Sequence, residues 1–436
     1  MKDNYKFSVV TLGCKVNQYE SDAITTLLQA KGWEPVDPKD KADCYVINTC
    51  TVTQKASMQS RQVVRQAIRN NPYARVIVTG CYAQTEPDHI KRIHGVSAIV
   101  GHGQKHNIPN MLSEGKPFPM APCKIAGERT FRKFPTAAYG TRTRPFLKIQ
   151  DGCSAFCSYC IVPYSRGPGR SMQLEEVIKN LEHLKFAGFK EAVLTGIHLG
   201  AYGLDFDPKT DLYNLLKLIA HSSPIHRIRV SSIEPDHLNH QIIRLVAESE
   251  VFCHHFHVPL QSGHNLILKK MRRPYKRDVF KKHIQKIHEL IPDAAIGTDI
   301  IVGFPGETEQ AFETTYSLIK SLPITYLHVF PFSGRKKTPA YSYKEKTDPN
   351  VIKKRAWKMR TLGSVKKQEF FRKFIGKRFE VIIEGKRDKK TGFLKGVTSN
   401  YIPVLATGDD SLKNRLVNIT ITDVKDADSV SGAILS

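Results

Sequence analysis

Three cysteines with the spacing Cys-x3-Cys-x2-Cys constrain the fold and the chemistry of this chain more than any other feature. Cys153, Cys157 and Cys160 follow a short apolar run at residues 146–150. Three thiolates at this spacing can surround one metal cluster. A 4Fe-4S cluster bound by only three cysteines keeps one iron open for a substrate or cofactor. We therefore predict a catalytic iron–sulfur site at these cysteines.

A zinc site is the alternative interpretation of this motif. Structural zinc takes four protein ligands, and no further Cys or His stands at a suitable spacing near Cys160. Iron–sulfur binding is therefore favoured. The N-terminus lacks a signal-peptide pattern, and no apolar run approaches the roughly 18 residues of a membrane span. We expect a cytoplasmic protein, with no membrane contact, in which clustered cysteines bind metal instead of forming disulfides.

A second set of cysteines, Cys14, Cys50 and Cys81, is dispersed in the sequence but shares one topological position. Each follows an apolar run typical of a buried strand, and helical patterns follow these runs. The runs lie at residues 7–12, 45–48 and 76–79, with helices expected at 21–31 and 54–70. Such alternation predicts a parallel sheet, whose strands end at one common edge. A lone cysteine there is usually a small buried apolar residue, but three at equivalent places predict a second open cluster.

A further series of strands and helices predicts an open or partial (β/α)6 barrel. Its strand candidates lie at residues 146–150, 192–194, 228–230, 254–258, 296–302 and 326–330. Helical patterns at 175–186, 212–220 and 280–290 separate some of them. Chemistry in such barrels occurs at the carboxyl ends of the strands, and the first triad follows the first strand. The fold class is therefore α/β.

Four short strand candidates near the C-terminus predict a small β-barrel of oligonucleotide-binding type. They lie at residues 379–383, 392–397, 402–406 and 416–421. We therefore expect an N-terminal α/β domain at 1–116, a Pro-, Arg- and Gly-rich linker at 117–141, the barrel at 142–372, and the small β-barrel at 373–436.

The charge of the chain points to a polyanionic partner. Lys and Arg number 66 against 41 Asp and Glu, which gives a formal charge of +25 at pH 7. The excess is concentrated at residues 269–286 and 353–378. A single basic run is usually a solvated helix face, but two runs within a basic chain favour RNA contact.

These features resemble the methylthiotransferase branch of the radical S-adenosylmethionine superfamily over nearly the whole chain. The resemblance rests on Leu12-Gly13-Cys14, Asn48-Thr49-Cys50 and Gly80-Cys81, on the segment from Asp151 to Ser171, and on a basic C-terminal module that looks like a TRAM domain. The family resemblance implies that Cys153, Cys157 and Cys160 hold the 4Fe-4S cluster that binds S-adenosylmethionine and cleaves it to a 5′-deoxyadenosyl radical.

The same resemblance implies that Cys14, Cys50 and Cys81 hold an auxiliary 4Fe-4S cluster that carries the sulfur to be methylated by a second S-adenosylmethionine. A reducing electron donor and a sulfur source are then expected partners, and we expect a monomer. Further cofactor contacts are expected where similar barrels line the pocket, at Tyr159, Gly196, Ser232, Gln261 and Val302.

The string Gly13-Cys-Lys-Val-Asn-Gln-Tyr-Glu20 resembles the branch that acts on N6-threonylcarbamoyladenosine at tRNA position 37. We therefore predict that the substrate is the anticodon stem-loop of such a tRNA. Isopentenyladenosine in tRNA and a ribosomal protein are the alternative substrates within the family. A non-catalytic iron–sulfur RNA-binding sensor is the alternative of another class, and it would not consume S-adenosylmethionine.

Overall fold

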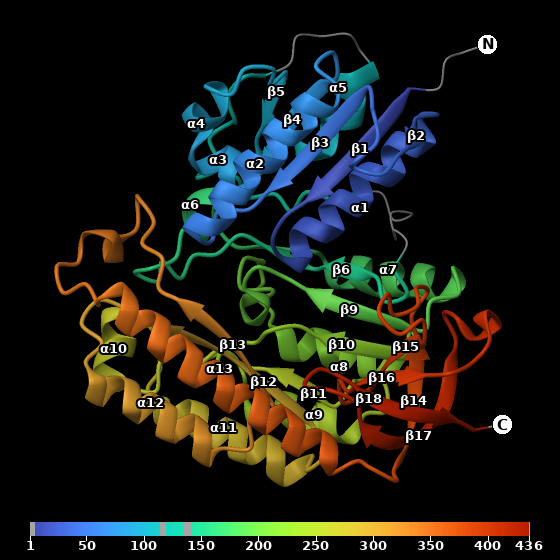
Figure 1. Cartoon of the computed structure of the whole chain (residues 1–436), viewed down its shortest axis with the longest axis vertical. Coiled ribbons are helices and arrows are strands. Elements are labelled where there is room, and N and C mark those ends of the chain that lie inside the picture. The colour runs from blue at the N-terminus through green and yellow to red at the C-terminus, as the bar shows by residue number, and fades with distance from the viewer. Residues whose placement is uncertain (1–4, 114–118, 135–141, 436) are drawn as a thin grey trace.

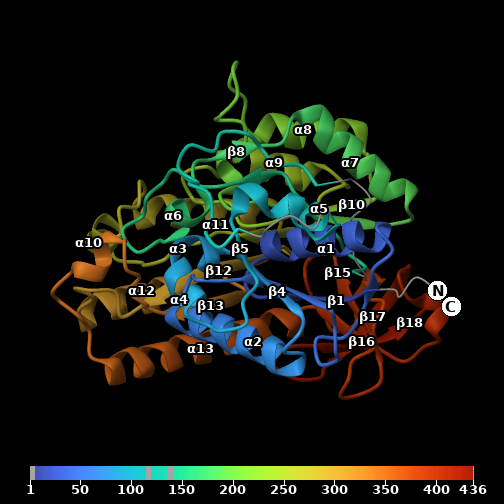
Figure 2. The ribbon, with the colours of Figure 1, turned by 90° about the horizontal axis from the view of Figure 1, so that it is seen from above.

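The computed structural model of this chain describes residues 5–113, 119–134 and 142–435. Figure 1 shows an N-terminal α/β part above a central barrel, with a small β-barrel, coloured red, beside the latter. Figure 2 shows the N-terminal part from above, lying over the central barrel. The predicted α/β class with a C-terminal β-barrel is confirmed.

The N-terminal part is a five-stranded parallel sheet with helices on both faces. β3 (Cys44–Thr49) is buried at every position, as expected of a central parallel strand. Helices α1 (Lys15–Ala30) and α5 (Ile108–Ser113) pack on one face, and α2 (Gln54–Asn70) packs on the other. The strand order is β2-β1-β3-β4-β5. The other elements are β1 (Lys6–Thr11), β2 (Glu34–Pro35), β4 (Arg75–Gly80), β5 (Ala98–Val100), α3 (Cys81–Thr85), α4 (Pro87–Lys91) and the 3-10 helix η1 (His102–Asn107).

Helix α1 begins at Lys15 and not at residue 21 as the sequence pattern predicted. Its first turns bury the polar side chains of Asn17 and Glu20, and these residues conceal the apolar periodicity that marks a helix.

The central part is a partial barrel of six parallel strands. One ladder contains β6 (Phe146–Lys148), β9 (Glu191–Thr195) and β10 (Arg227–Val230), and the other contains β11 (His255–His257), β12 (Ala295–Val302) and β13 (Tyr326–Pro331). A parallel bridge between Ile228 and Phe252 connects the ladders. The helices are α6 (Val162–Arg166), α7 (Leu174–Phe186), α8 (Leu212–Ser222), α9 (His240–Glu248), α10 (Asn265–Lys270), α11 (Arg277–Leu290), α12 (Glu309–Ser321) and α13 (Pro349–Arg372). Short elements are β7 (Gln150–Asp151), β8 (Arg170–Ser171), η2 (Leu199–Ala201) and η3 (Pro339–Ser342).

The C-terminal part is a closed β-barrel with the strand order β14-β15-β16-β18-β17. Its elements are β14 (Arg378–Ile383), β15 (Leu394–Thr398), β16 (Pro403–Ala406), η4 (Asp410–Leu412), β17 (Leu416–Val424) and β18 (Val430–Ile434). The sequence pattern missed β18, since its apolar residues are interrupted by Ser431 and Gly432. The barrel docks through Arg229, which donates to the carbonyls of Thr398 at 3.0 Å and Ser399 at 2.9 Å.

The expected linker at 117–141 is described only between residues 119 and 134, and residues 117–118 and 135–141 lie outside the described part. The described segment contains no helix or strand. It contacts both neighbouring parts, because Phe134 packs in the core of the N-terminal sheet and Phe131 packs against the barrel core. Among the described helices, none combines the length and the apolar character that crossing a membrane requires.

Candidate active site at two cysteine triads

The first cysteine triad lies in the loop between β7 and α6, just beyond the first barrel strand. The amide of Cys160 donates to the carbonyl of Cys157 at 3.0 Å, which closes the loop into a turn. The Cys153 and Cys157 thiols are both electrostatic neighbours of Cys160. Gly152 starts the loop at a φ of 72°, and an added Cβ there would overlap the carbonyl of Pro168. The three thiols therefore meet at the carboxyl end of a barrel strand, as the fold predicts.

Side chains from distant loops surround this triad, and no pattern in the sequence predicted that they lie there. Arg273 donates to the Sγ of Cys157 at 3.1 Å and forms an ion pair with Glu234. The Nδ1 of His198 lies 3.5 Å from the Sγ of Cys153. Burial raises the pKa of Glu234 to about 7, although Arg273 opposes this shift. No short motif contains these residues, since Arg273 follows Cys157 by 116 positions.

The second triad lies at the carboxyl edge of the N-terminal sheet. Cys14 precedes α1 as its N-cap, Cys50 follows β3, and Cys81 is the first residue of α3 directly after β4. Cys81 is an electrostatic neighbour of both Cys14 and Cys50. The parallel sheet thus brings together three cysteines that are far apart in the sequence, as their shared position after the strands predicted.

Gly13 leaves the space beside the second triad open. Its φ of 97° lies in the left-handed region, which favours glycine. A Cβ added to Gly13 would come within 2.9 Å of the Sγ of Cys50. A side chain at residue 13 would therefore fill the space next to this thiol.

Two short helices connect the surroundings of the two triads. α6 follows Cys160 in the chain, and α3 begins at Cys81. These helices pack against each other, and Figures 1 and 2 both place them side by side. Arg166, at the end of α6, is an electrostatic neighbour of Cys14 and Cys81. Arg166, which follows the first triad in the chain, therefore lies close to the second triad.

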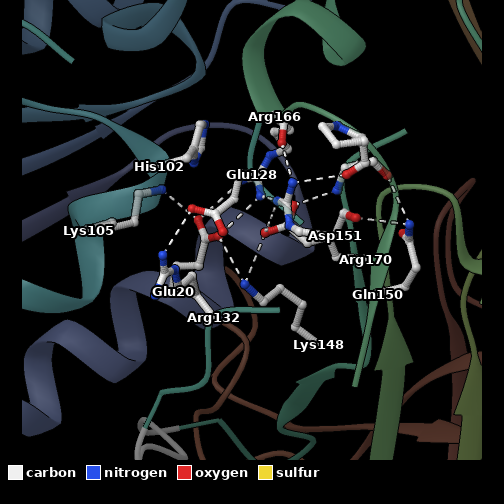
Figure 3. A network of polar contacts seen from close by, with 12 residues as sticks. Glu20, His102, Lys105, Glu128, Arg132, Lys148, Gln150, Asp151, Arg166 and Arg170 are labelled. Atoms are coloured by element: carbon white, nitrogen blue, oxygen red, sulfur yellow. Dashed lines mark hydrogen bonds and ion pairs between the residues drawn. The ribbon is translucent and has the colours of Figure 1, made fainter. Parts of the chain in front are cut away.

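Arg166 belongs to a buried ion-pair network that joins the N-terminal sheet to the barrel (Figure 3). Its guanidinium donates to Glu20 of α1 at 3.1 Å and to Asp151 at 2.8 Å. Lys105 donates to Glu20 at 2.6 Å, and Lys148 lies between Glu20 and Asp151 at 3.4 and 3.1 Å. Burial alone would raise the pKa of Glu20, but Arg166, Lys105 and Lys148 outweigh it and hold that pKa well below its usual range.

Two of the predicted cofactor contacts lie beside the first triad. Tyr159 lies inside the cysteine motif, and its partly buried phenol is an electrostatic neighbour of Cys157. Gly196 follows β9, and an added Cβ there would lie 2.9 Å from the Cβ of Gln150. Gln150 donates to the carbonyl of Gly152 at 2.9 Å and so supports the cysteine loop. Gly196 therefore allows this supporting contact.

The other predicted contacts lie at or beyond the ends of barrel strands. Ser232 follows β10 and is exposed, whereas Val302 ends β12 and is fully buried. Gln261 has a φ of 68° and lies beside β12, where its backbone amide donates to the backbone carbonyl of Asp299 at 2.8 Å. A contact of these residues with S-adenosylmethionine stays a prediction.

Both triads offer ligands that suit an iron–sulfur cluster. Burial raises the pKa of Cys50 to about 12 and that of Cys153 to about 11. These thiols therefore keep their protons at neutral pH until a metal replaces them. Within the described residues, the buried Nε2 of His198 has no hydrogen-bond partner, which leaves a polar atom free near Cys153. The residues present fit two clusters, each with one open iron.

Two family descriptions match successive parts of the chain. Uncharacterized protein family UPF0004 matches residues 6–101, and the Radical SAM superfamily matches residues 147–319. A threonylcarbamoyladenosine tRNA methylthiotransferase MtaB of Bacillus subtilis is 40% identical, with 94% of this chain and 92% of that protein covered. The chain belongs to the radical S-adenosylmethionine methylthiotransferase family. S-adenosylmethionine and 4Fe-4S clusters are therefore its cofactors, as predicted.

Further relatives of this methylthiotransferase cover similar lengths. MtaB of Aquifex aeolicus is 38% identical over 95% of this chain and all of its own length. A tRNA-2-methylthio-N(6)-dimethylallyladenosine synthase of Pelotomaculum thermopropionicum is 32% identical over 96% of each chain. The radical S-adenosylmethionine methyltransferase TsrM of Kitasatospora setae has the same fold, with a TM-score of 0.56 at 17% identity over 78% of this chain and 77% of that one.

Proposed function

We propose that this enzyme converts N6-threonylcarbamoyladenosine at position 37 of tRNA to its 2-methylthio derivative. The observation that carries the proposal is the packing of α6, which follows the first cysteine triad, against α3, which begins at Cys81 of the second triad. The MtaB relatives support the threonylcarbamoyl substrate, since they are 34 to 40% identical whereas the dimethylallyladenosine synthase is 32% identical.

In this proposal each triad holds one cluster. Cys153, Cys157 and Cys160 hold the cluster that binds S-adenosylmethionine, and Cys14, Cys50 and Cys81 hold the auxiliary cluster. When bound, the first cluster supplies the electron that cleaves S-adenosylmethionine, and the second supplies the site of sulfur transfer.

The surrounding residues position these two sites. Arg273 donates to Cys157 and pairs with Glu234, which fixes the cysteine loop relative to the strand ends. Arg166 ties the loop after Cys160 to Asn17 at 2.6 Å and to Glu20 of α1. A radical route suits the reaction, because the target C-H bond on a purine ring is not acidic enough for a side-chain base.

We further propose that Tyr159, Gly196, Ser232, Gln261 and Val302 line the S-adenosylmethionine pocket. Tyr159 lies within the first cysteine motif, and the other four lie at or beyond the carboxyl ends of barrel strands, which supports this assignment.

The RNA partner is the anticodon stem-loop in this proposal. The C-terminal β-barrel has the architecture of small nucleic-acid-binding barrels, and the chain carries a formal charge of +25. Target bases in RNA loops are accessible to a barrel mouth, unlike paired bases in a helix. The enzyme is proposed to act in the cytoplasm as a monomer that takes electrons and sulfur from other components.

The test is to incubate the reduced, cluster-loaded enzyme with matched tRNAs that carry adenosine, isopentenyladenosine or threonylcarbamoyladenosine. The tRNAs are then digested and the nucleosides are weighed by mass spectrometry. Methylthio product is expected only on the threonylcarbamoyl tRNA. Preferential methylthiolation of the isopentenyl tRNA would contradict the proposed substrate but not the proposed methylthiolation reaction.

A further inference from the structure

A cationic cavity of about 360 Å³ lies where the N-terminal sheet, the barrel and the C-terminal β-barrel meet. Its volume falls within the range of about 300 to 1,000 Å³ that is typical of small-molecule pockets. The charged side chains that line it are Lys15, Arg142, Arg144, Arg229, Lys386, Asp22 and Glu384. Cations outnumber carboxylates in this lining, so the cavity favours an anionic ligand.

Most of the inner cations already have partners within the chain. Arg229 forms an ion pair with Glu191 at 2.9 Å, and Arg144 forms one with Glu384 at 2.9 Å. Arg142 lies 3.3 Å from Asp22. These arginines are therefore partly neutralised, although they still contribute positive potential to the cavity.

Lys15 is held by a hydroxyl and not by an ion pair, although Asp299 is an electrostatic neighbour. Its Nζ donates to the hydroxyl of Ser231 at 3.2 Å, and within the described part of the chain it has no ion-pair partner. The side chain is half-buried, so an anion bound to it would be largely withdrawn from water. Charge-assisted hydrogen bonds are strongest in such surroundings.

The position of Lys15 connects the cavity to the site of chemistry. Lys15 directly follows Cys14 of the second triad, and Ser231 directly follows barrel strand β10. The ammonium group therefore lies between the auxiliary triad and the carboxyl ends of the barrel strands. Cys14 is also among the electrostatic neighbours of Lys15, so an anion bound to Lys15 would lie near the second triad.

We propose that this cavity binds the carboxylate of the threonyl group of the substrate nucleoside, with Lys15 as its principal partner. The inference rests on the proposed function and names the residue that reads its substrate. A threonylcarbamoyl group ends in a carboxylate, which forms a charge-assisted hydrogen bond with the ammonium. A dimethylallyl group is apolar and would leave the Lys15 ammonium without an anionic partner. The cavity therefore selects between the two tRNA substrates of the family.

The test uses two anticodon stem-loop RNAs that differ only at the threonyl group. One carries N6-threonylcarbamoyladenosine, and in the other the carboxylate is converted to the primary amide, which is neutral and similar in size. The kcat/KM for methylthio product is measured with the reduced, cluster-loaded full-length enzyme. The wild-type enzyme is expected to prefer the carboxylate by about 10- to 100-fold, as expected of one hydrogen bond between charged groups.

Variants then assign this preference to one side chain. Lys15→Gln is expected to reduce the ratio of the two kcat/KM values to near one, and Lys15→Arg is expected to retain most of it. Lys39→Gln removes an exposed lysine of the N-terminal part far from the cavity and is expected to leave the ratio unchanged. Because the ratio is taken within each variant, any loss of cluster next to Cys14 cancels.

Each other outcome has a defined meaning. An unchanged ratio in Lys15→Gln would overturn the inference, as would a wild-type enzyme that accepts the amide equally well. If the cavity held a backbone phosphate, Lys15→Gln would weaken binding of modified and unmodified stem-loops alike and leave the ratio unchanged. A wild-type enzyme that forms product on neither RNA, while it still releases 5′-deoxyadenosine, would contradict the proposed function together with this inference.

Discussion

Arg166 is the residue that couples the two halves of the site most directly. Its side chain is fully buried and contacts both Glu20 of the N-terminal sheet and Asp151 of the barrel. Removal of one member of a buried ion-pair network leaves the remaining charges without compensation. The network therefore stabilises one relative placement of the two triads.

We expect Arg166→Gln to lower the free energy of unfolding by about 3 to 5 kcal/mol, because it leaves Glu20 and Asp151 buried with less compensation. Urea denaturation followed by tryptophan fluorescence measures this change. Arg244→Gln is the matched control, since its ion pair with Glu248 on α9 is exposed and is worth about 1 kcal/mol or less. Equal, small effects of both substitutions would contradict the structural role of Arg166.

The sequence predicts the cysteines but not the residues that position them. Cys153, Cys157 and Cys160 form a local motif, and the second triad is predictable because each member follows a strand of a parallel sheet. Glu234 and Arg273 come from separate loops, and only the folded barrel brings them to the first triad. No local pattern distinguishes such residues from ordinary surface charges.

The basic run of helix α13 contains two kinds of cations: some hold the helix to the barrel, and others are exposed to solvent. Arg355 pairs with Glu307 at 2.9 Å, and Lys366 donates to the carbonyl of Leu322 at 2.8 Å, so these cations hold the helix to the barrel. Lys353 and Lys354 are exposed, and Trp357, one turn further along, is 68% exposed. The sequence places the run on a helix, but only the packing separates the cations available to RNA from the others.

We expect the double variant Lys353→Gln, Lys354→Gln to weaken binding of different tRNAs to a similar degree, because phosphate contacts carry no sequence information. The slope of log K against log salt should fall by about 0.7 to 0.9 for each phosphate that the variant no longer neutralises. Lys358→Gln is the matched control, since Lys358 already pairs with Glu313. Fluorescence anisotropy at several salt concentrations measures both quantities, and an unchanged slope in the double variant would mark this surface as a solvated face.

In the whole molecule, the proposed function requires two cysteine triads in separate parts of the chain to serve one reaction. The first triad belongs to the barrel and the second to the N-terminal sheet, which has its own apolar core on each face. Most of the longer strands follow from the sequence pattern, whereas it missed β2, β5, β8 and β18. The docking of the N-terminal part over the barrel does not follow from the sequence pattern, because it depends on buried polar contacts such as those of Glu20 and Lys148.

The activities of the two sites should therefore separate in variants. Replacement of Cys153, Cys157 and Cys160 by Ala is expected to remove half of the iron and to abolish cleavage of S-adenosylmethionine. Replacement of Cys14, Cys50 and Cys81 by Ala is expected to preserve some 5′-deoxyadenosine formation and to abolish methylthio product. Anaerobic iron analysis and chromatography measure these outcomes, and product formed by the second variant with added sulfide would contradict the sulfur-transfer role.

The most direct test of the central claim is nucleoside mass spectrometry of bulk tRNA from a strain that lacks this gene. We expect that 2-methylthio-N6-threonylcarbamoyladenosine disappears, that N6-threonylcarbamoyladenosine rises in its place, and that the wild-type gene restores the product. Methylthiolated isopentenyladenosine is expected to stay at its normal level. Persistence of the threonylcarbamoyl product, or loss of the isopentenyl product instead, would contradict the account.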